Sequence, residues 1–508
     1  MSAATFTLLF VLLGAIWYFL HRRAISRRKN DRKLPPGPAG LPVIGNLHKL
    51  GKLPHRSLRD LAEKYGPIMS IKLGSVPAIV VSSPQAAELF LKKHDAAFSS
   101  RPKIQASEYL FYGAKAMAFT EQGEYWRSVR KLCSTELLSG AKIDSYGGMR
   151  RQEVTAVVKS LKAAAAGGDV VDLSETVEVL AENLTCRMVF GRSSDDRFDL
   201  KGLVHEVLEL AGVFNIADYL PFLGPLDLQG FTRRMKETGK AIDKTLEMII
   251  DEHERDASRN QSQQKDFIDA LLALTHEVST SLSKFSFPID RTNMKAIAVD
   301  MIAGSIDTSA VEIVWTMSEL LRNPRVMKKL QEEIKMAVGE DRTVEETDLV
   351  KLPYLEMVIK ESLRLHPVAP LLVPHESMED VDVVLGKDCY FVPKKSRIMV
   401  NCWALGRDPK VWSENAEEFF PERFVGCDVD LQGHHFQLIP FGSGRRICPG
   451  IQLGLTTIRL VVAQLVHCFD WALPGGISPE ELDMREKFGL SLPRAQHLVA
   501  IPSYRLST

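Results

Sequence analysis

The chain has 508 residues, of which 45% are hydrophobic, and its 64 Lys and Arg balance 64 Asp and Glu, so that the formal net charge is zero. That length and apolar share suffice for a large core, and a neutral chain has no basic excess that would favour nucleic acid as a partner. The seven cysteines are scattered, without the close pairs of a zinc site. This pattern favours a reducing compartment over a disulfide framework.

The first apolar segment, residues 3–20, carries no charge and is about as long as a membrane-spanning helix. A basic run follows at residues 21–33, and the positive-inside rule places such a flank in the cytosol. A cleaved signal peptide is the alternative, but no Lys or Arg precedes the apolar run and no small-residue cleavage site follows it. We therefore expect residues 1–20 to be an uncleaved, single-pass anchor with the rest of the chain in the cytosol.

Residues 21–45 join this basic run to the proline-rich sequence that begins at Pro35. Because proline fixes φ and excludes helix, we expect a stiff hinge between the anchor and one large domain of residues 46–508.

The start of that domain alternates between helix and strand. Residues 55–65 predict a short helix, and two β-rich runs separated by Gly74-Ser75 predict a pair of strands at 68–73 and 78–82. Pro84 opens a further helix that we expect to reach about His94.

From there to about residue 280 the apolar periodicity is mainly helical. Trp126 and Arg130 lie one turn apart on one helix face, which by itself fits an ordinary amphipathic helix equally well. Arg127 and Lys131 form a second pair on the adjoining face and are candidates for docking an acidic partner, although a charged helix face is usually only solvated.

Two polar or low-complexity stretches, residues 160–169 and 255–265, predict surface loops. Residues 213–226 are apolar and contain two prolines.

A long helix is predicted from about Asp290 to Arg322, with a capping residue at its start and Asn323-Pro324 at its end. Its middle places Asp307 and Thr308 close to Gly304, a combination that is poor for helix stability. A protein tolerates such residues where proton donors must face a ligand. A buried helix with two satisfied polar side chains is the alternative.

The next segment combines a helix with short strands. Glu361 and Arg364 share one helix face, and Arg423 follows in a Pro-Glu-Arg-Phe sequence. Apolar, β-branched runs predict strands at residues 368–373, 389–392 and 398–401, which would form a small sheet.

Residues 441–450 form a glycine-rich loop that ends just before a helical apolar pattern. Cys448 therefore lies at a helix N-terminus, where backbone N–H groups and the helix dipole favour a thiolate. Arg446 could hold a carboxylate. A turn with a structural cysteine is the alternative.

This loop resembles the cysteine-ligand signature of the cytochrome P-450 superfamily, Phe-x-x-Gly-x-Arg-x-Cys-x-Gly, at Phe441, Gly444, Arg446, Cys448 and Gly450. The resemblance implies a mainly α fold with a small β region. It also implies that Cys448 ligates the iron of haem b. The implied cofactor-binding residues are Trp126, Arg130, His375, Phe441, Arg446, Cys448 and Gly450.

Other motifs of this family occur in the expected order. Residues 304–309 resemble its oxygen-activation segment, which implies catalytic roles for Asp307 and Thr308, but Ser305 stands where a second glycine is usual. The matching acid and two arginines form a structural triad in the family, here Glu361, Arg364 and Arg423.

The wording of several segments is closest to plant microsomal members that oxidise sesquiterpenes or biphenyls. The resemblance implies a monooxygenase in the endoplasmic reticulum membrane, in contact with lipid, which uses O2 and electrons from NADPH through a separate cytochrome reductase. No dinucleotide-binding motif occurs in the chain itself. A haem isomerase or dehydratase without a reductase, and a non-enzymatic haem-binding module, are the alternatives.

The resemblance also implies which residues line the substrate pocket: Met301, Gly304, Val368, Ala369, Leu372 and Leu490. These positions offer almost no polar side chain, so an ionised ligand would lose its hydration without compensation. We expect a small, neutral, lipophilic substrate, with a sesquiterpene preferred and a biphenyl as the alternative.

Overall fold

The computed structural model describes Gly14 and residues 32–193, 197–258, 266–278 and 289–506. Apart from Gly14, the predicted anchor at residues 3–20 lies outside the described residues, as does most of the basic run. Among the described residues, one helix is long and apolar enough to cross a membrane, and it is mostly buried inside the protein. That helix, α19 (Ile451–Cys468), is therefore a core helix.

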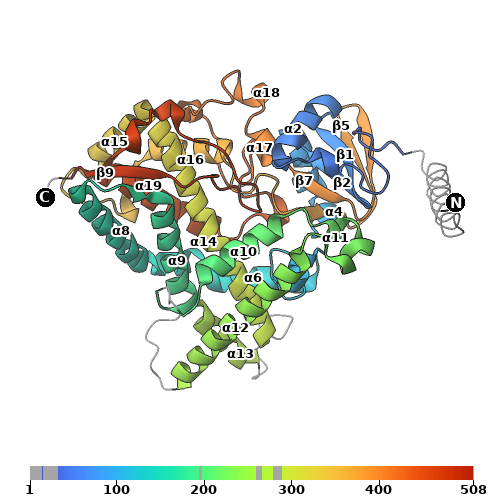
Figure 1. Cartoon of the computed structure of the whole chain (residues 1–508), viewed down its shortest axis with the longest axis horizontal. Helices are drawn as coiled ribbons and strands as arrows, with labels where there is room; N and C mark the ends of the chain where they lie inside the picture. Colours follow the sequence, from blue (N-terminus) through green and yellow to red (C-terminus); the bar gives the residue numbers. More distant parts are fainter. Residues whose placement is uncertain (1–13, 15–31, 194–196, 259–265, 279–288, 507–508) are drawn as a thin grey trace, which may run out of the picture.

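Helices form most of the molecule, and the strands gather into small sheets (Figure 1). The α-helices are α2 (Pro54–Tyr65), α3 (Pro84–Glu88), α4 (Asp95–Phe98), α5 (Gln105–Tyr109), α6 (Glu124–Leu132), α7 (Gly140–Ser145), α8 (Gly147–Gly167), α9 (Leu173–Phe190), α10 (Leu200–Gly212), α11 (Ile216–Tyr219), α12 (Phe231–Ser258), α13 (Phe267–Val278), α14 (Arg291–Arg322), α15 (Pro324–Val338), α16 (Pro353–Leu365), α17 (Cys402–Leu405), α18 (Pro409–Trp412) and α19. The strands are β1 (Ile68–Leu73), β2 (Val76–Val81), β3 (Val171–Asp172), β4 (His375–Glu376), β5 (Val381–Leu385), β6 (Asp388–Val392), β7 (Arg397–Val400), β8 (Phe469–Ala472) and β9 (Val499–Tyr504). The predicted mainly α fold with a small β region is confirmed.

The largest sheet has the strand order β1-β2-β7-β4 and lies at one end of the molecule, to the right in Figure 1. β1 and β2 form the predicted hairpin, β7 adds parallel to β2, and β4 adds antiparallel to β7. The other strands form the hairpin β5-β6 and the sheet β3-β9-β8.

The central helix α14 is buried along most of its length. Its start agrees with the prediction, because the Asp290 side chain accepts a hydrogen bond of 2.7 Å from the backbone N–H of Asn293. Asn323 ends it, and Pro324 begins the next helix. α14 packs against α9, α10, α16 and α19, so residues at its middle lie deep inside the molecule.

Three local predictions differ from the structure. Residues 160–169 are mostly helical, since α8 continues to Gly167 through four alanines, which are the strongest helix formers. The segment 255–265 begins inside α12, and its remainder lies outside the described residues. Residues 368–373 form no strand, because Pro370 has no N–H and the Val373 carbonyl accepts from Arg101 instead of a neighbouring strand.

The proline-rich segment lies along the free edge of β1. The Ser70 N–H donates to the Pro36 carbonyl at 2.9 Å, and the Ser70 hydroxyl donates to the Pro35 carbonyl at 2.7 Å. Farther along, the Lys72 N–H donates to the Asn46 side chain at 2.8 Å. A side chain at Gly37 would overlap the Ser70 carbonyl, which explains the glycine at this close approach.

Candidate active site

The cysteine loop, residues 441–450, contains the short 3-10 helix η7 (Gly444–Arg446) and leads directly into α19. The Cys448 N–H donates to the Phe441 carbonyl at 2.9 Å and closes the loop. Gly444 has a φ of 67°, and a Cβ there would lie 2.3 Å from the Leu91 carbonyl oxygen. The glycine is therefore required both by the left-handed backbone and by the contact.

Two opposing effects act on the Cys448 thiol. The Gly450 N–H and the charge of Arg130 lower its pKa, as expected of a helix N-terminus, but burial outweighs both and the net pKa is raised. The helix terminus alone therefore does not decide the ionisation of this thiol. A metal ion would deprotonate the thiol on binding.

Three arginines form a cluster beside this loop: Arg101, Arg130 and Arg446. Each is largely buried, and burial lowers the pKa of all three, that of Arg446 to about 9. Arg446 donates only to backbone carbonyls, those of Ser99, Met117 and Thr120. None of the three is salt-bridged to a carboxylate in the described part of the chain, since nearby Asp95 pairs with Arg445 at 2.8 Å. Buried cations without counter-ions indicate a site for an anionic ligand.

His375 borders the arginine cluster but offers it little as a donor. Its Nδ1 donates to the Phe98 carbonyl at 2.8 Å, so that in the neutral ring Nε2 can only accept. Burial, together with the charges of Arg101 and Arg446, holds the pKa of His375 well below its usual range. Arg101 is thus the stronger anion-binding residue here, and the sequence reasoning missed it because no motif marks it.

Helix α14 has one polar turn, residues 304–308, within its otherwise buried middle. Gly304 is exposed and Ser305, Asp307 and Thr308 are partly exposed, although Met301 to Ala303 are buried. No atom lies within 4 Å of where a Gly304 Cβ would be. The turn therefore faces an internal space, and the contact between Gly454 and Ser309 places the first turns of α19 next to it.

The two predicted catalytic side chains are held differently. The Thr308 hydroxyl donates to the Gly304 carbonyl at 2.6 Å, and the Ser305 hydroxyl donates in the same way to Met301. The buried Oδ2 of Asp307 has no hydrogen-bond partner in the described part of the protein, and burial raises the pKa of this carboxyl. The Asp307 carboxyl therefore binds a proton more readily than a solvated aspartate does.

The predicted triad is present as a fully buried network. Arg364 binds both carboxylate oxygens of Glu361, at 2.7 and 2.8 Å, and Arg423 Nε binds the same carboxylate at 2.8 Å. The remaining N–H groups of both arginines donate mainly to carbonyls of residues 406–418. The network therefore joins this irregular segment to α16.

A small pocket of about 80 Å³, called the channel below, lies between the α5–α6 loop, the end of α10 and residues 370–374. Its walls include Leu372 and Leu490 of the predicted pocket residues, together with Phe119 from the α5–α6 loop (residues 110–123) and Phe488. Met301, Val368 and Ala369 are buried or half-buried near it but do not line this channel. Its polar residues satisfy one another, since Arg397 donates to the Asp218 carbonyl at 3.2 Å.

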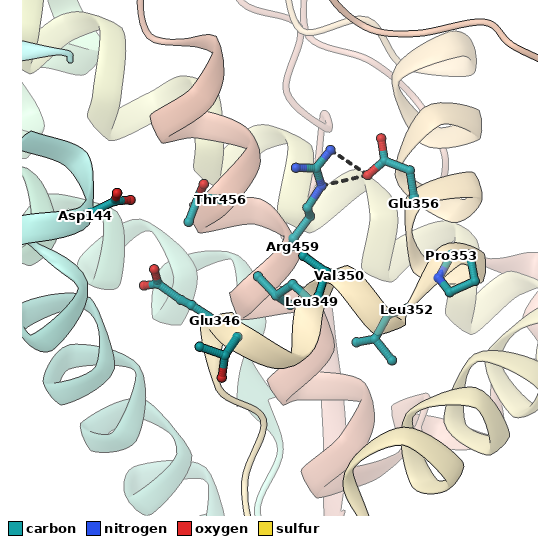
Figure 2. Close-up of a pocket in the computed structure, with 10 residues that line it drawn as sticks. Asp144, Glu346, Leu349, Val350, Leu352, Pro353, Glu356, Thr456 and Arg459 are labelled. Carbon is teal, nitrogen blue, oxygen red and sulfur yellow. Dashed lines mark hydrogen bonds and ion pairs between the residues drawn. The ribbon is translucent and has the colours of Figure 1, made fainter. Parts of the chain in front are cut away.

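A larger hollow of about 590 Å³ lies elsewhere, at the surface between α7, α16 and α19. Figure 2 shows its charged side chains, with Arg459 of α19 donating to Glu356 of α16 at 2.7 Å. Glu346 is held by Arg150 through two bonds of 2.7 Å. Mutually paired charges at an open surface are typical of structural contacts rather than of a reaction site.

The cysteine loop, the unpaired arginine cluster and the polar turn of α14 together define a haem-thiolate protein, because they provide a soft iron ligand, partners for two propionates and proton donors. A model of the family "Cytochrome P450" matches residues 35–499. The chain belongs to the cytochrome P450 family and is a haem b monooxygenase.

Curated plant relatives match over nearly the whole chain. Cytochrome P450 CYP736A12 of Panax ginseng is 60% identical, with 100% of each chain covered. 5-Epiaristolochene 1,3-dihydroxylase of Nicotiana tabacum is 41% identical and covers 96% of each chain. Premnaspirodiene oxygenase of Hyoscyamus muticus is 40% identical and covers 98% of each chain.

When bound, haem b supplies the dioxygen-activating iron of this family. The residues described above fit it: Cys448 as the axial ligand, the arginine cluster for the propionates, and Asp307 with Thr308 for delivering protons. These assignments of individual residues are proposals that the variants below test.

Proposed function

We propose that this monooxygenase hydroxylates a small, neutral, lipophilic plant metabolite, namely an unfunctionalised sesquiterpene olefin rather than an ionised compound. The observation that supports the proposal is the largely apolar lining of the channel, which includes Phe119, Leu372, Phe488 and Leu490. An apolar ligand gains about 25 cal/mol for each Å² that it buries there, whereas an ionised group would lose its hydration.

The polar residues of the channel wall, Asp218 and Arg397, are bonded to each other, and further polar groups lie on the α14 turn at Ser305, Asp307 and Thr308. A hydrocarbon needs no hydrogen-bond partner elsewhere in the pocket. Two relatives whose names specify sesquiterpene substrates support this choice. A biphenyl or phenolic substrate remains the alternative, because a flat aromatic ring system also fits apolar walls.

The same proposal includes membrane attachment at the endoplasmic reticulum through residues 1–20. Exposed apolar side chains occur on two segments: Phe222, Leu226 and Leu228, which follow the channel residue Tyr219, are each at least 64% exposed, and Leu41 and Val43 are more than half exposed. These two groups adjoin, because Gly74 contacts Ile44 on one side and Tyr219 on the other. An exposed apolar surface beside the channel favours lipid contact and substrate entry from the bilayer.

Electrons would come from NADPH through a cytochrome reductase. Arg127 and Lys131 are exposed on the side of α6 away from the arginine cluster, and neither is salt-bridged in the described part of the protein. Unpaired cations close to the haem edge suit an acidic electron donor. Reversing both charges should raise the reductase concentration needed for half-maximal rate, and Lys159→Glu on α8 is the matched control.

The test uses the full-length protein in microsomes with reductase, supplied with a sesquiterpene olefin, a biphenyl and a carboxylated analogue. We expect the olefin to give a type I spectral shift, consumption of NADPH and O2, and an alcohol product. Better turnover of the ionised compound, or no shift with any olefin or biaryl, would contradict the substrate assignment. The anchor is tested separately, since the protein should begin near Met1 and resist alkaline carbonate extraction.

A further inference from the structure

Two consecutive residues of the α5–α6 loop, Met117 and Ala118, are each bonded through both the backbone N–H and the backbone C=O. The Asp300 carboxylate of α14 accepts the N–H groups of Met117 and Ala118, the second at 3.3 Å. The Met117 carbonyl accepts from Arg446 Nη1 at 3.2 Å, and the Ala118 carbonyl accepts from Arg101 Nε at 3.1 Å. The loop thus connects the central helix to the arginine cluster.

This loop forms part of the channel wall. Phe119 lines the channel directly, and its ring packs 4.4 Å from that of Phe111. Asp300 lies eight residues before Thr308, which in a helix is about 12 Å along the same face. The contact between Asp300 and the loop therefore joins the channel wall next to Phe119 to α14, one helical turn before Gly304.

We propose that Asp300 is a positioning residue for the substrate pocket, which holds the α5–α6 loop closed against α14 by accepting the Met117 and Ala118 N–H groups. Without this acceptor, the wall at Phe119 is free to move away from α14. The proposal rests on the proposed use of the channel by substrate, but its first measurement needs no substrate.

Asp300 is not placed to bind a basic substrate. Both of its oxygens accept loop N–H groups, and no cation is salt-bridged to it in the described part of the chain. The titratable groups that face it from neighbouring elements are Tyr125 of α6 and Cys133 in the π-helical turn that follows α6. Burial raises the pKa of both, so they stay neutral near pH 7 and leave the carboxylate without a counter-charge.

The pH dependence of closure follows from this burial. Burial raises the pKa of Asp300 to about 7, while the two loop N–H groups oppose the shift. A carboxyl hydrated in the open loop would titrate near its ordinary value of about 3.9. The closed form therefore binds the proton more tightly, so closure weakens as the pH rises from about 4 to about 7 and is constant above that.

Hydrogen–deuterium exchange of the holoenzyme measures closure directly at the Met117 and Ala118 amides. Asp300→Ala should reduce their protection by about tenfold or more, the effect of losing two hydrogen bonds to one buried acceptor. Wild-type protection should fall between pH 5.5 and 7, whereas Asp300→Asn, which cannot ionise, should show no such fall. Glu312→Gln is the matched control, because Glu312 is a buried acid of α14 that bonds Thr316 rather than the loop.

The carbon monoxide spectrum of each variant verifies that haem–thiolate ligation is intact. With the haem in place, unchanged amide protection in Asp300→Ala would overturn the proposal, and protection that rises with pH in the wild type would overturn its pH dependence.

With an olefin that gives a spectral shift, Asp300→Ala should raise KM more than it lowers kcat. Loss of binding confined to amine-bearing ligands would instead make Asp300 a counter-ion. If the exchange result holds but no olefin binds, only the substrate assignment fails.

Discussion

The guanidinium carbon of Arg446 lies 4.1 Å from the centre of the Trp126 ring, so the cysteine loop and α6 are stacked on each other at the arginine cluster. A cation over an indole face is stabilised by the ring quadrupole, most strongly when it is desolvated. This stacking orients Arg446 while its N–H groups hold three loop carbonyls. Two residues that are 320 positions apart in the sequence thus fix one edge of the haem site.

The first prediction concerns the axial ligand. Cys448→Ser should abolish the red-shifted Soret band of the ferrous carbon monoxide complex, because an alcohol does not replace a thiolate as an iron ligand. Cys427→Ser, at a partly buried cysteine outside the loop, should keep the band. A Cys448→Ser protein that retained it would place the ligand elsewhere.

Loss of the Thr308 hydroxyl should separate electron use from product formation. Thr308→Ala should still bind haem and substrate, but product formed per NADPH should fall by about 10²-fold, the usual size of a general acid–base contribution. Thr308→Ser should restore most of it. Ser305→Ala tests whether the second hydroxyl, one turn earlier, shares the role. Wild-type coupling in Thr308→Ala would exclude the proton-delivery assignment.

Arg101 should contribute to retention of the haem, although no sequence motif marks this residue. Arg101→Ala removes a charge-assisted donor worth about 1.5–3 kcal/mol, so haem transfer to apomyoglobin should be roughly 10- to 100-fold faster. Lys103→Ala, at a side chain 75% exposed, serves as the control. Equal transfer rates for both variants would remove Arg101 from the propionate site.

The triad should matter for stability more than any surface ion pair. Glu361→Gln leaves two buried arginines partly unpaired and should destabilise the protein by about 3–5 kcal/mol in chemical denaturation. Glu356 lies on the same helix as Glu361, and Glu356→Gln breaks its partly exposed pair with Arg459 of α19 (Figure 2). For this variant we expect a loss of about 1 kcal/mol or less. Similar midpoints for the two variants would contradict a structural role for the triad.

Bulk at Ala369 should distinguish the two candidate substrates. Ala369 is half-buried near the channel, so Ala369→Phe should hinder a branched terpene more than a flat biaryl. Val350→Phe, at a residue 87% exposed on the remote surface hollow, should affect neither. Equal loss of both spectral shifts would mean that Ala369 does not shape the pocket.

The sequence predicts α14 almost to the residue, because a capping aspartate and a following proline are local signals that act whatever the tertiary fold. It fails at residues 368–373, where apolar composition favours a strand but the backbone carbonyls bind Arg101 and the Leu492 N–H. Such partners are distant in the sequence, and no local pattern contains them.

The candidate site shows the same contrast between residues marked by local motifs and residues whose partners are distant in the sequence. Cys448 and the Glu361 network follow from motifs with fixed spacing, whereas Arg101 and Asp300 are marked only by their contacts with loop backbone that folding brings to them. The ionisation of Cys448 could not be predicted either, since it depends on burial and not on the adjacent helix terminus alone.

The proline-rich segment along β1 has a consequence for shortening the chain. β1 is an edge strand, and an uncovered edge offers unpaired N–H and C=O groups to another molecule. A protein beginning at residue 32 would keep Pro35 and Pro36 bonded to Ser70, whereas one beginning at residue 47 would bare this edge. We expect the shorter protein to self-associate by strand pairing. Residues 35–46 would then protect the protein from aggregation by covering the edge of β1.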